Sequence, residues 1–398
     1  MSFANSTCPQ PTAVWFFALP CLPLLLVLLP AVSPEPASSP APASVQVDDR
    51  TPFEDLFTHV RSIPIEGTEE HPVFDLRDIA VQGDTMFVLD QQGATLSAFR
   101  LDGTFLYQVG RPGRGPGEFT NPDRVEPLSD GQLAILESYP NNRIQTLSSR
   151  TGQPLDTITD RVNVHPDTPG AYVEIHDGAP HLISSTSVPC TEDGSEATRN
   201  ENNQWNRLCV VQEHNLNSGT LVRRFATRKT VNPEFRRMSP YPMGRDQAGQ
   251  TYVAHIVGSS VAVFERDGTF LRRFSLDSAP TFRVLEDPPP SSIMGQQLFE
   301  EMRNHEHSIV NHLSVVGQDV VLDHAYKTSE GINEFYFSIF GTDGGHKAST
   351  PVRAEHPNER VGLLRDVQGD RFYFQETDLD SELGFYVIHE YRYTGVPE

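Results

Sequence analysis

The chain alternates short runs of apolar residues with turns that contain glycine, and this pattern predicts β-hairpins over most of its length. The clearest unit, Phe99-Arg-Leu-Asp-Gly-Thr-Phe-Leu106, recurs at 264–271 as Phe-Glu-Arg-Asp-Gly-Thr-Phe-Leu. Weaker copies have their turns at 149–152, 217–219, 342–344 and 394–395. Each turn glycine supplies the positive φ that a tight hairpin needs. We therefore count six copies of one unit.

Two further short strands precede each copy. They lie at 77–81 and 85–90 before the first copy, and at 124–128 and 132–136 before the second. Each unit is thus a four-stranded antiparallel meander, and repeats of ~40–50 residues built in this way are typical of propeller blades. Helical periodicity is confined to 292–304. The expected fold is all-β, a six-bladed β-propeller of four-stranded antiparallel blades.

The end of the chain predicts how the ring closes. After the sixth turn, at Gly395, only Val-Pro-Glu follows, so the last blade lacks an outer strand of its own. The strand-like segment 57–65 lies upstream of the first complete blade, and Pro64 within it is tolerated on an outer strand. We expect this N-terminal strand to complete the last blade, which removes an exposed sheet edge.

The N-terminal region is typical of an exported protein. Residues 13–32 are uncharged and largely apolar, and a stretch rich in Pro, Ala and Ser follows them. No basic residue precedes Arg50, so the positive n-region of an ordinary signal peptide is missing. Pro20 and Pro23 disfavour a stable spanning helix, so a signal peptide is still preferred over an uncleaved anchor. The expected organisation is a signal peptide or anchor at 1–33, a Pro/Ala/Ser-rich linker at 34–50 and the propeller at 51–398. The expected location is the periplasm, the cell envelope or the exterior.

The cysteine count predicts one disulfide. Cys8 and Cys21 lie in the N-terminal apolar region, which leaves Cys190 and Cys209, 19 positions apart, in the rest of the chain. In an oxidising compartment these two pair most simply with each other, closing a loop worth ~3 kcal/mol in the chain-entropy model.

The charge of the chain argues against nucleic acid as a partner. It has 53 acidic and 31 basic residues, a formal net charge of −22. A phosphate-binding surface needs clustered Lys and Arg, and no long basic stripe occurs. Only three of the basic residues are lysines, and an acidic, lysine-poor composition resembles that of proteins from salt-loving organisms. A GC-rich genome that favours arginine codons explains the missing lysines about as well.

One blade-linking segment carries a family resemblance. Gly110-Arg-Pro-Gly-Arg-Gly-Pro-Gly-Glu-Phe-Thr-Asn-Pro122 resembles the G-x-G-x-G-P-G-x-F-x-x-P signature of NHL-repeat propellers, and Asn142-Arg-Ile-Gln145 is similar to their N-R-I-Q. The chain looks like the six-bladed propellers that are common as exported bacterial proteins. Because such rings include lactonases, lyases and protein-binding modules, the resemblance implies the fold and leaves the activity open.

The innermost strands of a propeller line its central channel, and several of them carry charged side chains here. Arginines mixed with carboxylates suit a polar or anionic ligand, and they equally suit ion pairs that fill the axis. The candidate binding residues are Arg77, Asp78, Arg124, Glu126, Glu174, His176, Arg245 with its neighbour Asp246, His312, Arg365 and Asp366. A calcium ion, as in lactonase-like propellers, would use Asp78, Glu126 and Glu174.

Three long segments are expected on one face of the ring. In an up-and-down blade, the turns between strands 2 and 3 and the links between blades emerge on the same side. The long segments at 110–121, 188–206 and 277–306 fall at such positions. Loops on a rigid scaffold are common binding sites, so this looped face is the expected partner surface. The His305-Glu-His307 run is better explained by a solvated loop than by a metal site.

These observations favour a non-catalytic exported propeller that binds a protein, a peptide or an envelope glycan through its looped face. No G-x-S-x-G, Walker or dinucleotide motif occurs, so we assign no catalytic residue and no cofactor other than possible calcium. The alternative is a metal-dependent lactonase- or lyase-like enzyme with its site in the channel. A structural module of a larger envelope assembly is a third interpretation.

Overall fold

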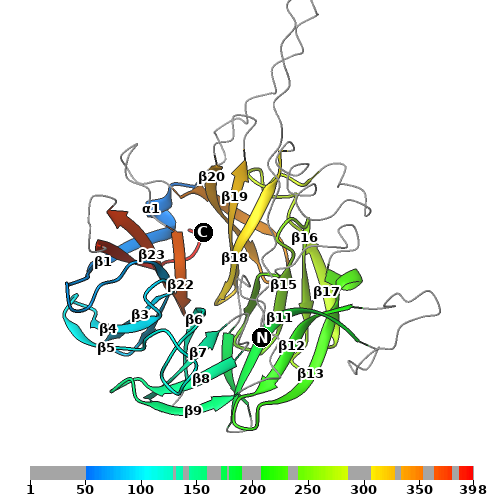
Figure 1. Cartoon of the computed structure of the whole chain (residues 1–398). Helices are drawn as coiled ribbons and strands as arrows, with labels where there is room; N and C mark the ends of the chain where they lie inside the picture. The colour runs from blue at the N-terminus through cyan, green and yellow to red at the C-terminus, as the bar shows by residue number, and fades with distance from the viewer. Residues whose placement is uncertain are drawn as a thin grey trace, which may run out of the picture. The chain divides into compact units, whose positions relative to one another are not determined.

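A computed structural model describes residues 51–128, 131–137, 143–158, 172–176, 179–190, 208–231, 241–285, 306–327, 333–352, 363–378 and 385–397. Within these ranges the chain forms six antiparallel sheets of four strands each, arranged around a central axis (Figure 1). The fold is the expected all-β, six-bladed propeller. We number the blades 1 to 6 in chain order.

Five blades are built from consecutive strands, which run from the axis outward. Blade 1 comprises β2 (Leu76–Gln82), β3 (Thr85–Asp90), β4 (Thr95–Arg100) and β5 (Phe105–Val109). Blade 2 comprises β6 (Pro122–Pro127), β7 (Gln132–Glu137), β8 (Arg143–Ser148) and β9 (Pro154–Ile158). Blade 3 comprises β10 (Tyr172–His176), β11 (Ala179–Pro189), β12 (Leu208–Asn215) and β13 (Thr220–Thr227).

Blades 4 and 5 repeat the same order. Blade 4 comprises β14 (Met243–Arg245), β15 (Thr251–Ala254), β16 (Ser260–Phe264) and β17 (Phe270–Ser275). Blade 5 comprises β18 (Ser308–Val316), β19 (Asp319–Lys327), β20 (Asn333–Gly341) and β21 (His346–Pro351). Two short helices, α1 (Phe53–Leu56) and α2 (Arg228–Val231), accompany the sheets, and the predicted helix at 292–304 lies outside the described residues.

Blade 6 is shared between the two ends of the propeller. It comprises β22 (Leu363–Gln368), β23 (Arg371–Asp378) and β24 (Phe385–Tyr393), and its outermost strand is β1 (Phe57–Glu66). β1 pairs antiparallel with β24 from Phe57 opposite Tyr393 to Glu66 opposite Phe385. In Figure 1 the blue strand β1 lies in the same sheet as the red strands of this blade. The predicted closure by an N-terminal strand is confirmed.

The hydrophobic core is divided into layers between neighbouring blades. One cluster joins Phe87 and Leu89 of blade 1 to Val125 and Leu133 of blade 2. Another joins blades 5 and 6, where the ring of Phe57 lies 5.1 Å from that of Phe337, centroid to centroid. The apolar side chains of each sheet are thus buried against the next sheet. Polar residues occupy the ends of the innermost strands, near the axis.

The segment that resembles the NHL signature is held by two residues of β8. Arg143 forms a buried ion pair with Glu137, Nε to Oε1 2.7 Å, and donates to the backbone carbonyls of Arg114 and Glu118. The Gln145 Oε1 accepts from the backbone N–H of Gly117 at 2.9 Å. The blade link is thus fixed to the sheet that follows it, which accounts for a charged pair in the interior of blade 2.

The disulfide prediction is also confirmed, since Cys190, directly after β11, is bonded to Cys209 of β12. Other expectations fall outside the described residues, including the N-terminal segment and linker at 1–50 and much of the loops at 188–206 and 277–306. In the part of the chain that the structure describes, no helix is long and apolar enough to cross a membrane.

Candidate functional site

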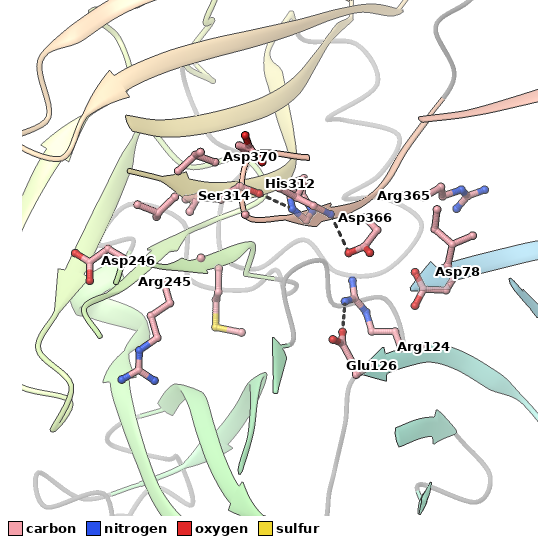
Figure 2. A pocket seen from close by; sticks show the side chains of 18 of the residues that line it. Asp78, Arg124, Glu126, Arg245, Asp246, His312, Ser314, Arg365, Asp366 and Asp370 are labelled. Atoms are coloured by element: carbon pink, nitrogen blue, oxygen red, sulfur yellow. Dashed lines mark hydrogen bonds and ion pairs between the residues drawn. The ribbon is translucent and has the colours of Figure 1, made fainter. Parts of the chain in front are cut away.

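A cavity of about 700 Å³ lies on the axis, where the innermost strands β2, β6, β14, β18 and β22 converge. Figure 2 shows Arg124, Glu126 and Asp366 gathered in its centre, with Asp78 and Arg365 on one side and Arg245 and Asp246 on the other. Its ionisable lining residues are Asp78, Arg124, Glu126, Arg245, Asp246, His312, Arg365, Asp366 and Asp370. The cavity therefore presents both signs of charge from five rigid strands.

A shared irregularity directs side chains into this cavity. The pairing register of the innermost strand shifts in four blades, immediately before Asp78, Arg124, His312 and Asp366. Such a bulge inserts one unpaired residue and re-aims the side chains that follow it. In each of these blades the residue directly after the shift lines the cavity. The same bulge in four blades thus directs side chains into the cavity.

Hydrogen bonds across blade boundaries fix several of these groups. Asp78 Oδ2 accepts from the backbone N–H of Val125 in the next blade at 2.9 Å. Arg365 donates to Gln375 Oε1 at 2.6 Å and to the backbone carbonyl of Arg77 at 3.2 Å. These bonds join blade 6 to blade 1 and blade 1 to blade 2, so the site is positioned by the closed ring.

Three carboxyl groups in the cavity have raised pKa values. Burial is the largest cause in each case, and it raises the pKa of Asp78 to about 6, of Asp366 to about 7 and of Glu126 to about 8. The charges of Asp78 and Asp366 raise the pKa of Glu126 further, whereas the nearby Arg124 lowers it. Arg124 lies 3.4 Å from Glu126, Nη1 to Oε1. Arg124 and Arg365 both lower the pKa of Asp78, so the arginines beside this cluster offset only part of the cost of burying its charges.

The histidine in the cavity is a neutral group. Burial, with a smaller effect of the positive charge of Arg124, lowers the pKa of His312 to about 4. Its Nε2 lies 2.8 Å from the Ser314 hydroxyl, two residues along β18. At neutral pH this pair offers hydrogen-bond donors and acceptors without adding positive charge.

The cavity extends toward one end of the channel. Its lining includes Gln247, Gly317, Gly369 and Asp370, which lie in the turns between the first and second strands of blades 4, 5 and 6. The blade link at 110–121 enters its blade at the opposite end of the innermost strand. The cavity and the predicted looped face are therefore two separate candidate surfaces.

Most of the predicted site residues line this cavity. They are Asp78, Arg124, Glu126, Arg245, His312, Arg365 and Asp366. Arg77, on the bulge of β2, is not among the lining residues, and its Nη2 lies 3.3 Å from Asp123 Oδ1. Glu174 and His176 lie on β10, opposite His181 and Ala179. Their side chains are outside what the structure describes.

Sequence reasoning missed three polar residues of the cavity, two in turns and one on β18. Gln247, Ser314 and Asp370 line the cavity, and none was predicted. Gln247 and Asp370 each lie two positions after the end of an innermost strand, and that position is the signal that would have found them. The solvated-loop interpretation of the His305 to His307 run holds for Glu306, which is exposed, and is wrong for His307, which is buried, while His305 lies outside the described residues. In the described ranges, no group of three His, Cys, Asp or Glu side chains is arranged to hold a metal ion.

Comparisons with known proteins agree with this fold. Residues 43–151 match the family model DUF5128, described as a 6-bladed beta-propeller. A member of the DUF4221 family from Bacteroides vulgatus superimposes with a TM-score of 0.58 at 10% identity, covering 85% of this chain and 99% of its own.

A second solved structure, a candidate exported protein from Bacteroides fragilis, gives a TM-score of 0.56 at 11% identity and covers 87% and 98% of the two chains. No curated protein matches the sequence. At such low identity the likeness concerns the fold alone. The chain is a six-bladed β-propeller that is similar over residues 43–151 to the DUF5128 proteins.

Proposed function

We propose that this chain is an exported binding protein, and that its axial cavity holds a peptide segment of a partner without catalysing a reaction on it. The observation that carries this proposal is the mixed charge of a cavity of about 700 Å³ built on rigid strands. A peptide combines backbone donors and acceptors with charged side chains or termini. Each side of the cavity carries an arginine and a carboxylate, and this mixture matches that combination, because each charged group orients its counterpart.

The lining favours a peptide over an envelope glycan. No Phe, Tyr or Trp is among the residues that line the described cavity. Sugar rings usually pack their apolar faces on aromatic side chains, so a glycan would lose its most common contact here. A peptide does not depend on aromatic contacts, since its backbone is recognised by hydrogen bonds and its side chains by charge.

Export is the second part of the proposal. It is supported by the apolar N-terminal segment at 13–32, by the Cys190–Cys209 disulfide, and by the likeness to a candidate exported protein of Bacteroides fragilis. A disulfide persists in an oxidising compartment. There it also stabilises the folded scaffold, because it constrains the unfolded chain.

One observation favours an enzyme as the second candidate. Carboxyl groups with raised pKa values beside arginines and a neutral histidine are typical of acid–base sites. With a pKa of about 8, Glu126 is protonated at neutral pH and is able to act as a general acid. Tightly held, stoichiometric calcium in the purified protein, with loss of stability on chelation, would favour the metal-dependent lactonase- or lyase-like enzyme.

Affinity selection with a phage-displayed library of random heptapeptides tests the peptide proposal. We expect enriched peptides to bind the intact propeller and to bind the Arg245→Met variant at least about tenfold more weakly, since a charged hydrogen bond contributes ~1.5–3 kcal/mol. Arg150→Gln, at an exposed turn of blade 2, is the matched control and should bind normally. Failure to enrich any peptide, or equal binding by the two variants, would contradict the proposal.

A further inference from the structure

A second cluster of reactive groups lies on the closing blade, away from the axial cavity. Ser62 of β1 lies directly opposite His389 of β24, and the Ser62 Oγ is 2.9 Å from His389 Nδ1. The other ring nitrogen, His389 Nε2, is 2.6 Å from Glu376 Oε2 of β23. Three adjacent strands thus place a hydroxyl, an imidazole and a carboxylate in one continuous series of hydrogen bonds.

The proton positions in this series follow from the chemistry of its ends. A carboxylate only accepts hydrogen bonds, so Glu376 fixes the proton of His389 on Nε2. With that proton on Nε2, the Nδ1 lone pair faces the Ser62 hydroxyl and accepts its hydrogen bond. A nucleophile within reach of a base, which a third group orients, is the arrangement that activates a serine.

A second histidine lies on the other side of the hydroxyl. His59 Nε2 is 3.1 Å from Ser62 Oγ. Because Ser62 donates its proton to His389, its oxygen accepts from the Nε2–H of His59. A donor at this position is also within reach of the oxyanion that forms when Oγ attacks a carbonyl.

The cluster is accessible to a substrate. Ser62 and His59 are exposed, and the side chains of His389 and Glu376 are 20% and 39% exposed. β1 is the outermost strand of its sheet. An outermost strand leaves alternate backbone N–H groups on its outer edge available to an incoming acyl group. The site is open rather than enclosed, which suits a small or extended acyl donor.

We propose that Ser62 is the nucleophile of an acyl-transfer site that takes carboxylic esters as substrates, with His389 as the general base, Glu376 as its positioning residue and His59 as the oxyanion donor. This inference does not depend on the proposed peptide-binding function, since it uses a different surface of the propeller.

The reaction proceeds in two balanced steps. The Ser62 Oγ attacks the carbonyl carbon, its proton passes to His389 Nδ1, and the same proton leaves with the alkoxide as the ester C–O bond breaks. Water then attacks the acyl-serine, and its proton passes through His389 back to the Ser62 oxygen while the carboxylic acid departs. Neither step needs an oxidant or a metal ion.

The test uses p-nitrophenyl acetate with the intact chain. We expect release of p-nitrophenolate with acetylation of Ser62, located by peptide mass mapping. Ser62→Ala should remove that acetyl group. His389→Gln should slow acetylation at least about tenfold, because general base catalysis typically contributes 10²–10⁴-fold. Glu376→Gln should slow it less, and Glu376→Asp, which keeps a carboxylate, should restore part of the rate if Glu376 acts through the imidazole.

Ser218, an exposed serine in the turn before β13, is the matched control. Ser218→Ala should leave the rate of acetylation at Ser62 unchanged. Mapping of the unmodified protein needs no variant, so a poorly folding Ser62→Ala chain would not prevent the test. The proposal would be overturned if Ser62 is acetylated no faster than Ser218, or if His389→Gln leaves the rate of acetylation unchanged. The cluster would then be only a structural connection between β1 and β24.

Discussion

The Asp78 carboxylate accepts a 2.9 Å hydrogen bond from the backbone N–H of Val125, and this bond connects the innermost strands of two neighbouring blades. The bond favours the ionised carboxylate, yet burial outweighs it and raises the pKa of Asp78 to about 6. The same cost of burial raises the pKa values of Asp366 and Glu126. At these three carboxyl groups the folded chain therefore binds more protons than the unfolded chain between about pH 4 and pH 8.

A pH-dependent gain of stability is expected from Glu126→Gln. The folded-state pKa of about 8 lies above the ordinary value of 4.5, so the stability that this carboxyl contributes is present below pH 4.5 and is lost as the pH rises through about 8. Glutamine does not ionise. The variant should therefore exceed the unmodified chain in free energy of unfolding at pH 9, by on the order of 2 kcal/mol, and the difference should shrink toward pH 5. Urea denaturation at several pH values measures it.

Asp84→Asn is the control for that experiment, because the Asp84 side chain is 77% exposed on the surface. Its unfolding free energy should follow that of the unmodified chain across the same pH range within about 0.5 kcal/mol. A Glu126→Gln profile that runs parallel to the unmodified one would show that the carboxyl is well solvated in the folded state.

Removal of Arg143 should destabilise the propeller strongly. Its partner Glu137 is fully buried, and without the guanidinium it becomes an unpaired interior charge. We expect Arg143→Met to lower the free energy of unfolding by ~3–5 kcal/mol in urea titrations. The exposed pair of Arg100 and Asp84 is the comparison, and Arg100→Met should cost only about 0–1 kcal/mol. Similar losses in the two variants would mean that the blade link does not depend on the buried pair.

The blades and their closure were predictable because the signals are local. A turn glycine between two apolar runs marks a hairpin wherever it occurs, and Gly103 adopts the expected positive φ of 87°. The contact between the Gly103 turn and the closing strand was not predictable. A Cβ at this glycine would lie 2.7 Å from the ring of Pro64 in the closing strand, so the turn of blade 1 packs directly against blade 6.

The candidate site was predictable only as a list of charged residues on innermost strands. A β-bulge adds one residue and leaves no clear mark in the pattern of apolar and polar positions, so the sequence did not reveal which side chains turn inward. Arg77 and Asp78 illustrate this, since only Asp78 lines the cavity. The pairing of Ser62 with His389 depends on a register between strands 327 residues apart in the chain, which no local pattern specifies.

Loss of the disulfide should weaken the folded state. The Cys190–Cys209 bond closes a loop with a sequence separation of 19, and the chain-entropy model assigns such a loop ~3 kcal/mol. The double variant Cys190→Ser, Cys209→Ser should lose about that much in urea denaturation under oxidising conditions. Reduction should destabilise the unmodified chain and leave the double variant unchanged. Free thiols in freshly isolated protein, detected as no mass gain on reduction, would contradict this prediction.

The closing strand should be essential to the stability of the ring, and Ile63 tests this most directly. Ile63 of β1 is fully buried in a cluster with Phe99 of blade 1 and Ile388 of blade 6. Ile63→Ala removes three buried carbons at the boundary of these two blades, so the free energy of unfolding should fall by ~2–5 kcal/mol. Thr58→Ala, at an exposed position of the same strand, should change it by no more than about 0.5 kcal/mol.

Limited proteolysis provides a second measurement of this closure. Because β1 forms the outer edge of blade 6, its local detachment exposes backbone that is otherwise paired with β24. Ile63→Ala should therefore be cleaved between 57 and 66 faster than the Thr58→Ala control, under conditions in which both chains remain folded. If the two variants are cleaved at the same rate and unfold at the same urea concentration, β1 would add little to a ring that the other strands already hold closed.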